Sequence, residues 1–401
     1  MKNFFYTFLI FQPIVFLTCA LLVYCEPVDT GLDSENSSTI KDSQLSLSLE
    51  DVATLLAEIP LEKDQMNEVY DAVKASLNNG YDEEYTMRNL FAVPGSGVGD
   101  DIETKAESSS YAKPLRDLIV EYSKLKSSTK SSSDSFVDSL SSSDIQIYWP
   151  YSENWDGKQD PIITYAPSYD TDKNVGYLRK VGSDGNVVLE ECIVDEETAM
   201  SRPVWVVNQN DDAGYKTLEM LRKDDPDWGM GGSVVVKSND DSSWDVKSLM
   251  IKNFCAKRNY DPWFAGASEF FVKCGAIENF KATTEKELLE YNPLVTDFLV
   301  VVKRNQIGKT IPYNVVLVSE WTDQLESCAF MVTEDDGGTL QTWSCSANVK
   351  IKSKTYGFDI SIPFNKRDDI VWRGQLTRRY FEKNESVAGR FGDVVITFEI
   401  K

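Results

Sequence analysis

The residues best suited to chemistry are the carboxylates of a short acidic turn. Glu334, Asp335 and Asp336 follow an apolar run and precede two glycines. Carboxylate oxygens on a tight turn are hard ligands of the kind that calcium prefers. Three further loops with paired aspartates would add ligands if they converge on this turn: 211–212, 240–241 and 368–369. The alternative is a solvated acidic loop, because acidic turns are common in a chain with a net charge of −23.

An aromatic group marks a second candidate site. Trp149, Tyr151 and Trp155 lie close together in the sequence, and Asp156 follows the last of them. Aromatic rings beside polar groups often bind sugars, because the ring stacks on an apolar sugar face while the polar groups bind hydroxyls. The same residue types also fill the core of a β-sandwich or the junction between two domains. These four residues therefore predict either a surface that binds a glycan or protein ligand, or a packed core.

The chain contains no histidine, which narrows the enzyme classes. Ser–His–Asp and Cys–His nucleophile systems are excluded, and so is nearly every catalytic zinc site built on imidazole. A carboxylate-dependent glycan hydrolase would need two acidic side chains across a cleft. Carboxylates are present for it, but no pair is singled out by spacing: Asp156, Glu190, Glu191, Glu269 and Glu334. The sequence therefore leans toward a protein that is not an enzyme.

Five cysteines follow Cys25, and no two of them are spaced as CxxC. This spacing does not indicate a metal cluster or a thioredoxin-like redox motif. An odd number leaves at least one free thiol, and small buried hydrophobic residues are the favoured interpretation. A disulfide between Cys328 and Cys345 across a hairpin is the alternative.

Residues 1–24 predict an export signal. Lys2 is followed by a long apolar run that ends at Tyr24, which is the pattern of a signal peptide. Cys25 would then be the lipidated residue that attaches the mature chain to a membrane. Tyr24 departs from the small residue that usually precedes such a cysteine. An ordinary cleaved signal, which would leave the protein secreted or periplasmic, and an uncleaved anchor are the alternatives.

The composition divides the first part of the chain into three segments. Residues 25–46 are acidic and polar and predict a flexible tether. Residues 47–126 predict a helical domain, because apolar residues recur at helical spacing after an N-cap at Ser48. The acidic run 82–84 predicts the start of a short third helix that continues through Leu90 and Phe91. Residues 127–143 are rich in serine and predict a flexible linker, and the alternative is one helical turn formed by Phe136, Val137 and Leu140.

From residue 144 the pattern changes to the alternation of β-strands. Residues 144–258 predict a β-rich domain with a short helix near 216–222, and residues 259–401 predict an antiparallel β-sandwich. The expected fold class is thus α+β and mainly β: a small N-terminal helical domain, a β-rich middle region and a C-terminal antiparallel β-sandwich. The net charge of −23 disfavours binding to nucleic acid.

Two segments carry a resemblance to a known group of proteins. They are Ile147-Tyr148-Trp149-Pro150-Tyr151-Ser152 with Trp155-Asp156-Gly157, and Asn259-Tyr260-Asp261-Pro262-Trp263-Phe264-Ala265-Gly266 with Ser268-Glu269-Phe270. From about residue 145 onward, the chain resembles uncharacterised cell-envelope lipoproteins of Bacteroidetes type. The resemblance implies a C2-like β-sandwich that opens at Trp263, with the acidic turn on its rim. No established activity comes with that family.

These observations predict an exported protein of the cell envelope, at the outer membrane or cell surface. It would be held to the membrane by an N-terminal lipid on Cys25 and would bind a ligand or partner without catalysis. No cofactor is expected other than calcium. A glycan hydrolase and a structural or adhesive sandwich stiffened by calcium are the alternatives.

Overall fold

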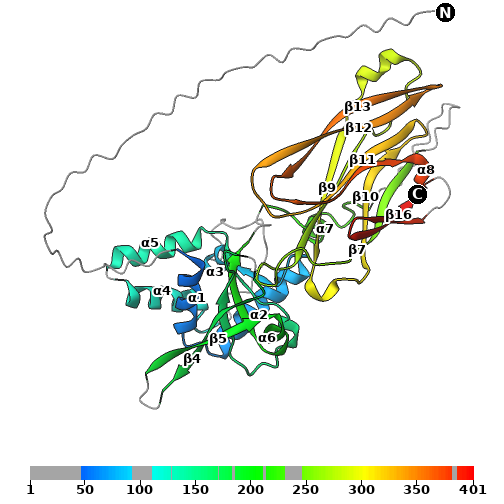
Figure 1. The fold of residues 1–401 in the computed structure, drawn as a ribbon. Helices are drawn as coiled ribbons and strands as arrows, with labels where there is room; N and C mark the ends of the chain where they lie inside the picture. Colours follow the sequence, from blue (N-terminus) through cyan, green and yellow to red (C-terminus); the bar gives the residue numbers. More distant parts are fainter. Residues whose placement is uncertain are drawn as a thin grey trace, which may run out of the picture. The chain divides into compact units, whose positions relative to one another are not determined.

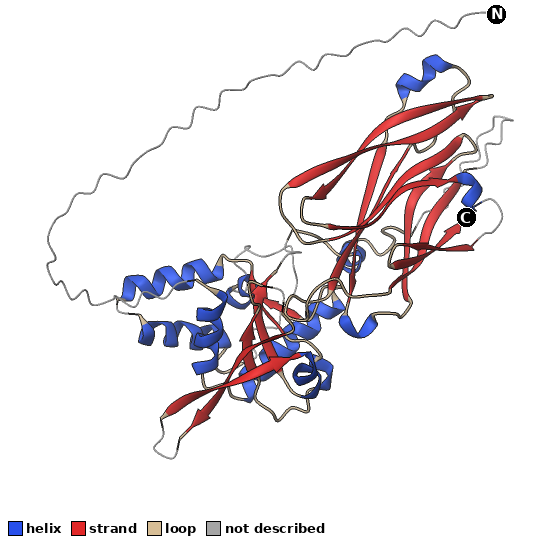
Figure 2. Cartoon of the chain, in the orientation of Figure 1, coloured by secondary structure: helices blue, strands red, loops and turns tan. Residues whose placement is uncertain are grey.

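A computed structural model describes residues 47–92, 111–127, 129–169, 171–182, 186–210, 214–230, 246–381 and 386–401 (Figure 1). The predicted signal peptide, Cys25 and the acidic tether lie outside these residues. The fold class is α+β and mainly β, with a small helical region near the N-terminus, as predicted (Figure 2).

The N-terminal helices follow the periodicity of the sequence closely. They are α1 (Leu49–Glu58), α2 (Lys63–Asn78), α3 (Met87–Phe91), α4 (Leu115–Lys126) and α5 (Lys130–Ser141). Ser48 caps α1 as predicted, its Oγ accepting a hydrogen bond from the Asp51 amide at 3.0 Å. The short third helix predicted to run through Phe91 is present as α3, but it begins at Met87 and not at the acidic run 82–84, because this run leads into strand β1 (Glu84–Thr86). None of the helices in the described ranges has the length and apolarity needed to cross a membrane.

The serine-rich segment 127–143 is not a linker, since α5 occupies most of it. Thr129 caps the helix by accepting a hydrogen bond from the Ser132 amide at 3.2 Å. Phe136 and Leu140 are buried in the core, and their spacing places them on one face of the helix. The prediction failed because the serines outnumber these anchors and most of them lie on the exposed side.

The helices and the first sheet form one lobe with a common core. The sheet runs β1–β2–β6–β3–β4–β5, with β3 and β6 parallel and the other pairs antiparallel. Its further strands are β2 (Ile145–Tyr148), β3 (Ile162–Tyr165), β4 (Lys173–Val181), β5 (Val187–Asp195) and β6 (Val204–Gln209). One apolar cluster contains residues of α1, α2, α4 and α5 together with Trp149 and Trp205. The predicted helical domain is therefore not separate, and we call residues 49–209 the α/β lobe.

The β-sandwich consists of two sheets that share one core. The smaller sheet contains β10 (Ile311–Trp321), β7 (Lys247–Ala256), β16 (Val394–Ile400) and β15 (Ser386–Phe391) in this order. The larger contains β13 (Lys354–Asn365), β12 (Leu340–Ile351), β11 (Leu325–Glu334), β8 (Ser268–Ala276) and β9 (Leu294–Val302), with β14 (Asp369–Thr377) also paired to β11. Because β7 pairs with β10 and β16, the boundary predicted at residue 258 is wrong.

Short helices complete the described chain. They are η2 (Ser152–Asn154), α6 (Glu196–Ser201), α7 (Leu218–Asp224), η3 (Glu285–Glu290), η4 (Arg304–Gln306) and α8 (Arg378–Phe381). The predicted helix near 216–222 corresponds to α7, whose Leu218 belongs to the core of the sandwich. The five cysteines of the described chain are free thiols, including Cys328 and Cys345. Three are buried, as expected for small core residues.

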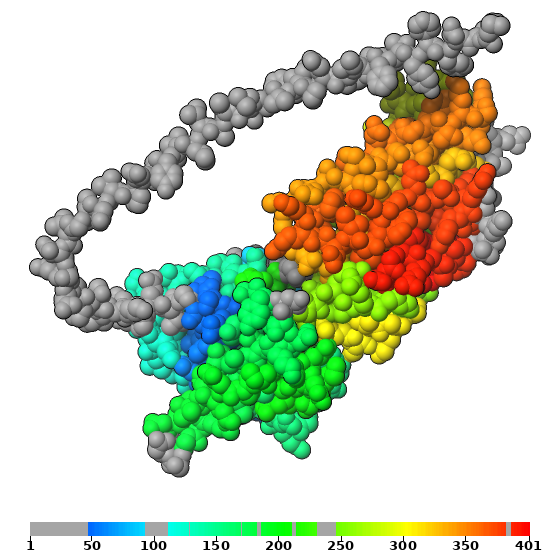
Figure 3. All heavy atoms as spheres, viewed as in Figure 1, coloured from blue at the N-terminus to red at the C-terminus, as the bar shows by residue number. Residues whose placement is uncertain are grey.

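A segment that we call the junction loop, residues 257–267, connects β7 to β8 and touches the α/β lobe. Trp263 and Phe264 are almost fully buried and pack on an apolar face of the lobe sheet with Tyr148, Val204 and Val206. In the space-filling view the lobe is coloured blue to green and the sandwich yellow-green to red (Figure 3). The junction loop therefore joins the two by packing as well as by chain connection.

Candidate metal centre

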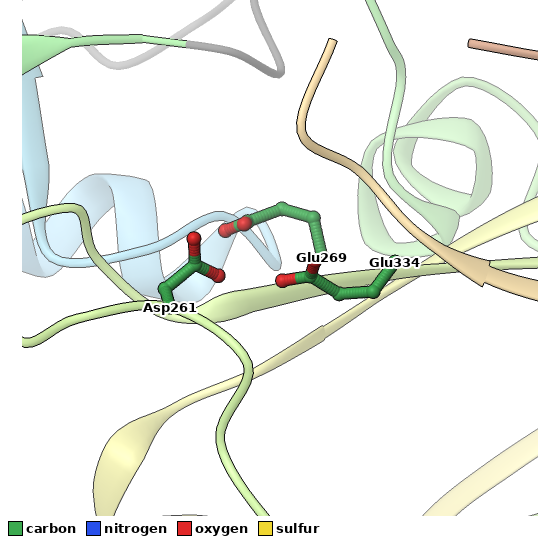
Figure 4. Close-up of side chains that lie close together, drawn as sticks. All are labelled: Asp261, Glu269 and Glu334. Atoms are coloured by element: carbon green, nitrogen blue, oxygen red, sulfur yellow. The ribbon is translucent and has the colours of Figure 1, made fainter. Parts of the chain in front are cut away.

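Three carboxylates from separate parts of the sequence converge where the junction loop meets the sandwich. Asp261 comes from the junction loop, Glu269 from the start of β8 and Glu334 from the end of β11. One ligand oxygen from each lies within 4.8 Å of the others. The three side chains point toward one another (Figure 4).

The ends of two paired strands position the two glutamates. Glu334 lies opposite Phe270 in the register of β11 and β8, and opposite residues share a face. Glu334 is therefore on the side of the buried Phe270. Glu269 precedes Phe270, so the pleat alone would direct it to the other face. The two carboxylates meet because both residues lie at the end of the strand pair, where the sheet no longer separates them.

Hydrogen bonds to its backbone hold Asp261 in place. The Asp261 carbonyl accepts from Asn259 Nδ2 at 2.5 Å and from Arg304 Nη1 at 3.1 Å. Arg304 also forms an ion pair with Glu196 of α6, with 2.6 Å between Nε and Oε1. Since the Arg304 guanidinium is committed to Glu196 and to loop carbonyls, it positions Asp261 rather than binding its carboxylate.

The centre is buried and poor in hydrogen-bond donors. Glu334 is 1% exposed and Glu269 is 5% exposed. Within the described part of the chain, Glu334 Oε1 and Asp261 Oδ2 have no hydrogen-bond partner. Buried carboxylate oxygens without donors are costly, and such a cost is relieved by a cation or by a shared proton.

The electrostatics of the centre reflect this uncompensated negative charge. Burial, together with the neighbouring Asp261, raises the pKa of Glu334 to about 12. Burial raises the pKa of Asp261 to about 6, and Asp336 adds to the effect. Both pKa shifts mean that the ionised forms of these carboxyl groups are disfavoured at the centre unless a cation lies beside them.

The acidic turn contributes only one of its three predicted ligands to this centre. Asp335 is buried, and its Oδ1 instead accepts hydrogen bonds from the Gly337 amide and Asn365 Nδ2, both at 3.0 Å. Asp336 is exposed. The loop at 368–369 does approach the turn, because Asp368 Oδ2 accepts from the Asn365 amide at 2.8 Å. The pairs at 211–212 and 240–241 lie outside the described residues.

The aromatic group is divided between the core and the surface. Trp149 is 1% exposed and belongs to the core of the α/β lobe, where the Trp155 ring lies 5.3 Å from it. Tyr151 is half-buried and donates to Glu196 Oε1 at 2.7 Å, while Asp156 is exposed and accepts from the Lys158 amide. Trp149 is therefore a core residue, and a surface ligand could contact only Tyr151, Trp155 and Asp156.

Asp261 and Glu269 were not recognised as metal ligands from the sequence. Both stand in the second segment that carried the resemblance, and Glu269 was also among the carboxylates considered for a hydrolase. The available signal was an aspartate in a loop flanked by large aromatic residues, close before a strand that starts with Ser268-Glu269. That signal indicates a buried carboxylate, but it does not indicate which other carboxylates lie beside it.

No protein-family model, curated protein or solved structure matches this chain. The class of site is therefore defined by its own geometry: three hard oxygen donors, from two buried glutamates and the half-buried Asp261, at the edge of an antiparallel sandwich. Calcium bonds of about 2.4 Å would allow donor oxygens on opposite sides of the ion to lie about 4.8 Å apart, which fits the observed spread. Glycoside hydrolysis at this centre is not favoured, because it needs carboxylates accessible to a sugar and Glu334 is buried.

Proposed function

We propose that this chain is an exported, membrane-tethered envelope protein without catalytic activity, in which a calcium ion stabilises the junction loop against the sandwich. The observation that supports the calcium site is the convergence of Asp261, Glu269 and Glu334, with unpartnered buried oxygens on two of them. Calcium would bind these oxygens directly, whereas the nearby Arg304 guanidinium contacts the Asp261 carbonyl and Glu196. Export and attachment through Cys25 are supported by the sequence of residues 1–25.

Calcium titration of the metal-stripped full chain, followed by calorimetry, tests this function. We expect one site with measurable heat, together with a rise in the melting temperature when calcium replaces EDTA. Glu334→Gln should abolish both effects, because it removes a charged ligand without changing the shape of the side chain. Asp156→Asn is the matched control, since it removes an exposed carboxylate outside the centre. A chain that shows neither heat nor a melting shift would refute the calcium site.

A ligand-binding surface for a glycan or a protein partner remains part of the proposal. The half-buried Tyr151 and Trp155 and the exposed Asp156 are the residues that would contact it. Binding of a glycan panel to wild-type protein and to Trp155→Ala would test this surface. Equal binding by both proteins would argue against it.

A further inference from the structure

We propose that calcium at this centre controls the docking of the junction loop on the α/β lobe, and so regulates the connection between the lobe and the sandwich. The inference rests on the proposed calcium site. It starts from the position of Asp261, which stands two residues before Trp263 in the same short loop. One end of the loop thus supplies a ligand, and the next residues supply the contact with the lobe.

Asp261 is the one ligand of the three that does not lie in a strand. Glu269 and Glu334 lie in paired strands, and the Asp335 amide donates to the Glu269 carbonyl at 2.9 Å. Asp261 lies outside any strand, in a loop held by side-chain contacts. If the three carboxylates repel one another, the displacement with the lowest cost is therefore movement of the junction loop.

The lobe holds the loop through a small number of specific contacts. Asn208 Nδ2 donates to the carbonyls of Phe264 and Ala265 at 3.1 and 2.6 Å. Asp82 Oδ2 accepts from the Ala267 amide at 2.8 Å, and the Trp263 indole donates to the Asp172 carbonyl at 3.0 Å. These bonds surround the buried rings of Trp263 and Phe264, so that displacement of the loop breaks them together.

Asp82 is a buried carboxylate on the lobe side of the junction, and the nearby Lys303 and Arg304 offset the cost of its burial only in part. It is 4% exposed, and its Oδ1 has no hydrogen-bond partner among the described residues. The buried carboxyl group of Asp82 therefore faces the loop that carries Asp261, and the negative charge of either residue disfavours ionisation of the other. A cation at the centre would lower this repulsion across the junction as well as within the cluster.

The coupling has a thermodynamic form. The docked loop presents three carboxylates to calcium, whereas an undocked loop leaves only Glu269 and Glu334 in place. Calcium must then bind the docked state more tightly, and it shifts the equilibrium by that difference in affinity. By reciprocity, any change that weakens docking must weaken calcium binding by the same factor.

Hydrogen exchange of the full chain, with and without calcium, measures the docking directly. We expect the amides of residues 263–267 to exchange about tenfold more slowly when calcium is present. Asn208→Ala, which touches no ligand, should weaken calcium binding about fivefold to tenfold through loss of its hydrogen bonds. Trp263→Phe, which loses the indole N–H bond and part of the buried ring, is a second variant. Gln65→Ala is the control, because Gln65 is a buried amide that donates to the Lys113 carbonyl among the helices.

Each outcome separates the inference from the proposed function. Slower exchange with calcium, weaker binding by both loop-contact variants and unchanged binding by Gln65→Ala would support the coupling. Calcium binding with unchanged exchange, and with wild-type affinity in Asn208→Ala and Trp263→Phe, would overturn the coupling and leave the calcium site intact. Absence of calcium binding by the wild-type chain would refute the site itself and the inference with it.

Discussion

Glu334→Gln is expected to stabilise the calcium-free protein, although it removes a proposed ligand. In the folded state, burial and Asp261 raise the pKa of Glu334 from 4.5 to about 12. The carboxyl group must therefore take up a proton on folding at neutral pH. Glutamine is neutral and needs no proton, so the substitution removes this cost.

The magnitude follows from the difference in pKa between the folded and unfolded states. Because the folded-state pKa is the higher one, the stability from this group is complete below pH 4.5 and is lost as the pH rises. The loss is about 1.4 kcal/mol for each pH unit above 4.5, which gives about 3 kcal/mol at pH 7. Glu334→Gln should then be more stable than wild type by up to about 3 kcal/mol at pH 7 in EDTA, and by much less at pH 5.

Urea denaturation between pH 5 and pH 7 is the assay. In EDTA, the wild-type free energy of unfolding should fall relative to that of Glu334→Gln as the pH rises. With calcium at one hundred times its dissociation constant, wild type should gain about 2.7 kcal/mol and the variant nothing. Glu326→Gln, near the other end of β11, controls for a general effect of removing charge. Parallel pH profiles of wild type and Glu334→Gln in EDTA would refute the reasoning.

Three further predictions concern other parts of the chain. Phe136→Ala should lower the free energy of unfolding by about 3–5 kcal/mol, since Phe136 is buried; a thermal melt like that of wild type would exclude α5 from the core. Ser48→Ala should lower it by about 1 kcal/mol through loss of the N-cap of α1, and denaturation at the same urea concentration as wild type would contradict the cap. Mass spectrometry of the mature N-terminus should find a lipid on Cys25, and a free residue there would leave a secreted protein.

Helices and strands whose apolar residues recur at a regular spacing could be predicted from the sequence. The apolar residues recur at the helical period in α1, α2 and α4, and at the strand period in most strands. Segment α5 was predicted as a linker with one helical turn as the alternative, because few apolar residues anchor it among many serines. Sequence order also does not show that the helices pack on the first sheet or that β7 pairs with β16.

The candidate site could be predicted only in part, for a geometric reason. The acidic turn led to Glu334, but its neighbours in sequence point elsewhere: Asp335 into its own turn and Asp336 toward solvent. The true neighbours of Glu334 are Asp261 and Glu269, which the pairing of β8 with β11 brings to it. Strand register is a long-range property, so composition and spacing do not reveal it.

The pairing of β7 with β16 also has a consequence for the kinetics of folding. Ala256 lies opposite Val394, so this contact closes a loop of about 140 residues, at an entropic cost that no nearby contact offsets in advance. The contacts within α1 and α2 and between β4 and β5 are local and form early. We expect the smaller sheet of the sandwich to be assembled in the slowest refolding phase. Until then, the apolar faces of β7 and β10 stay open to other chains, and aggregation competes with folding at this stage.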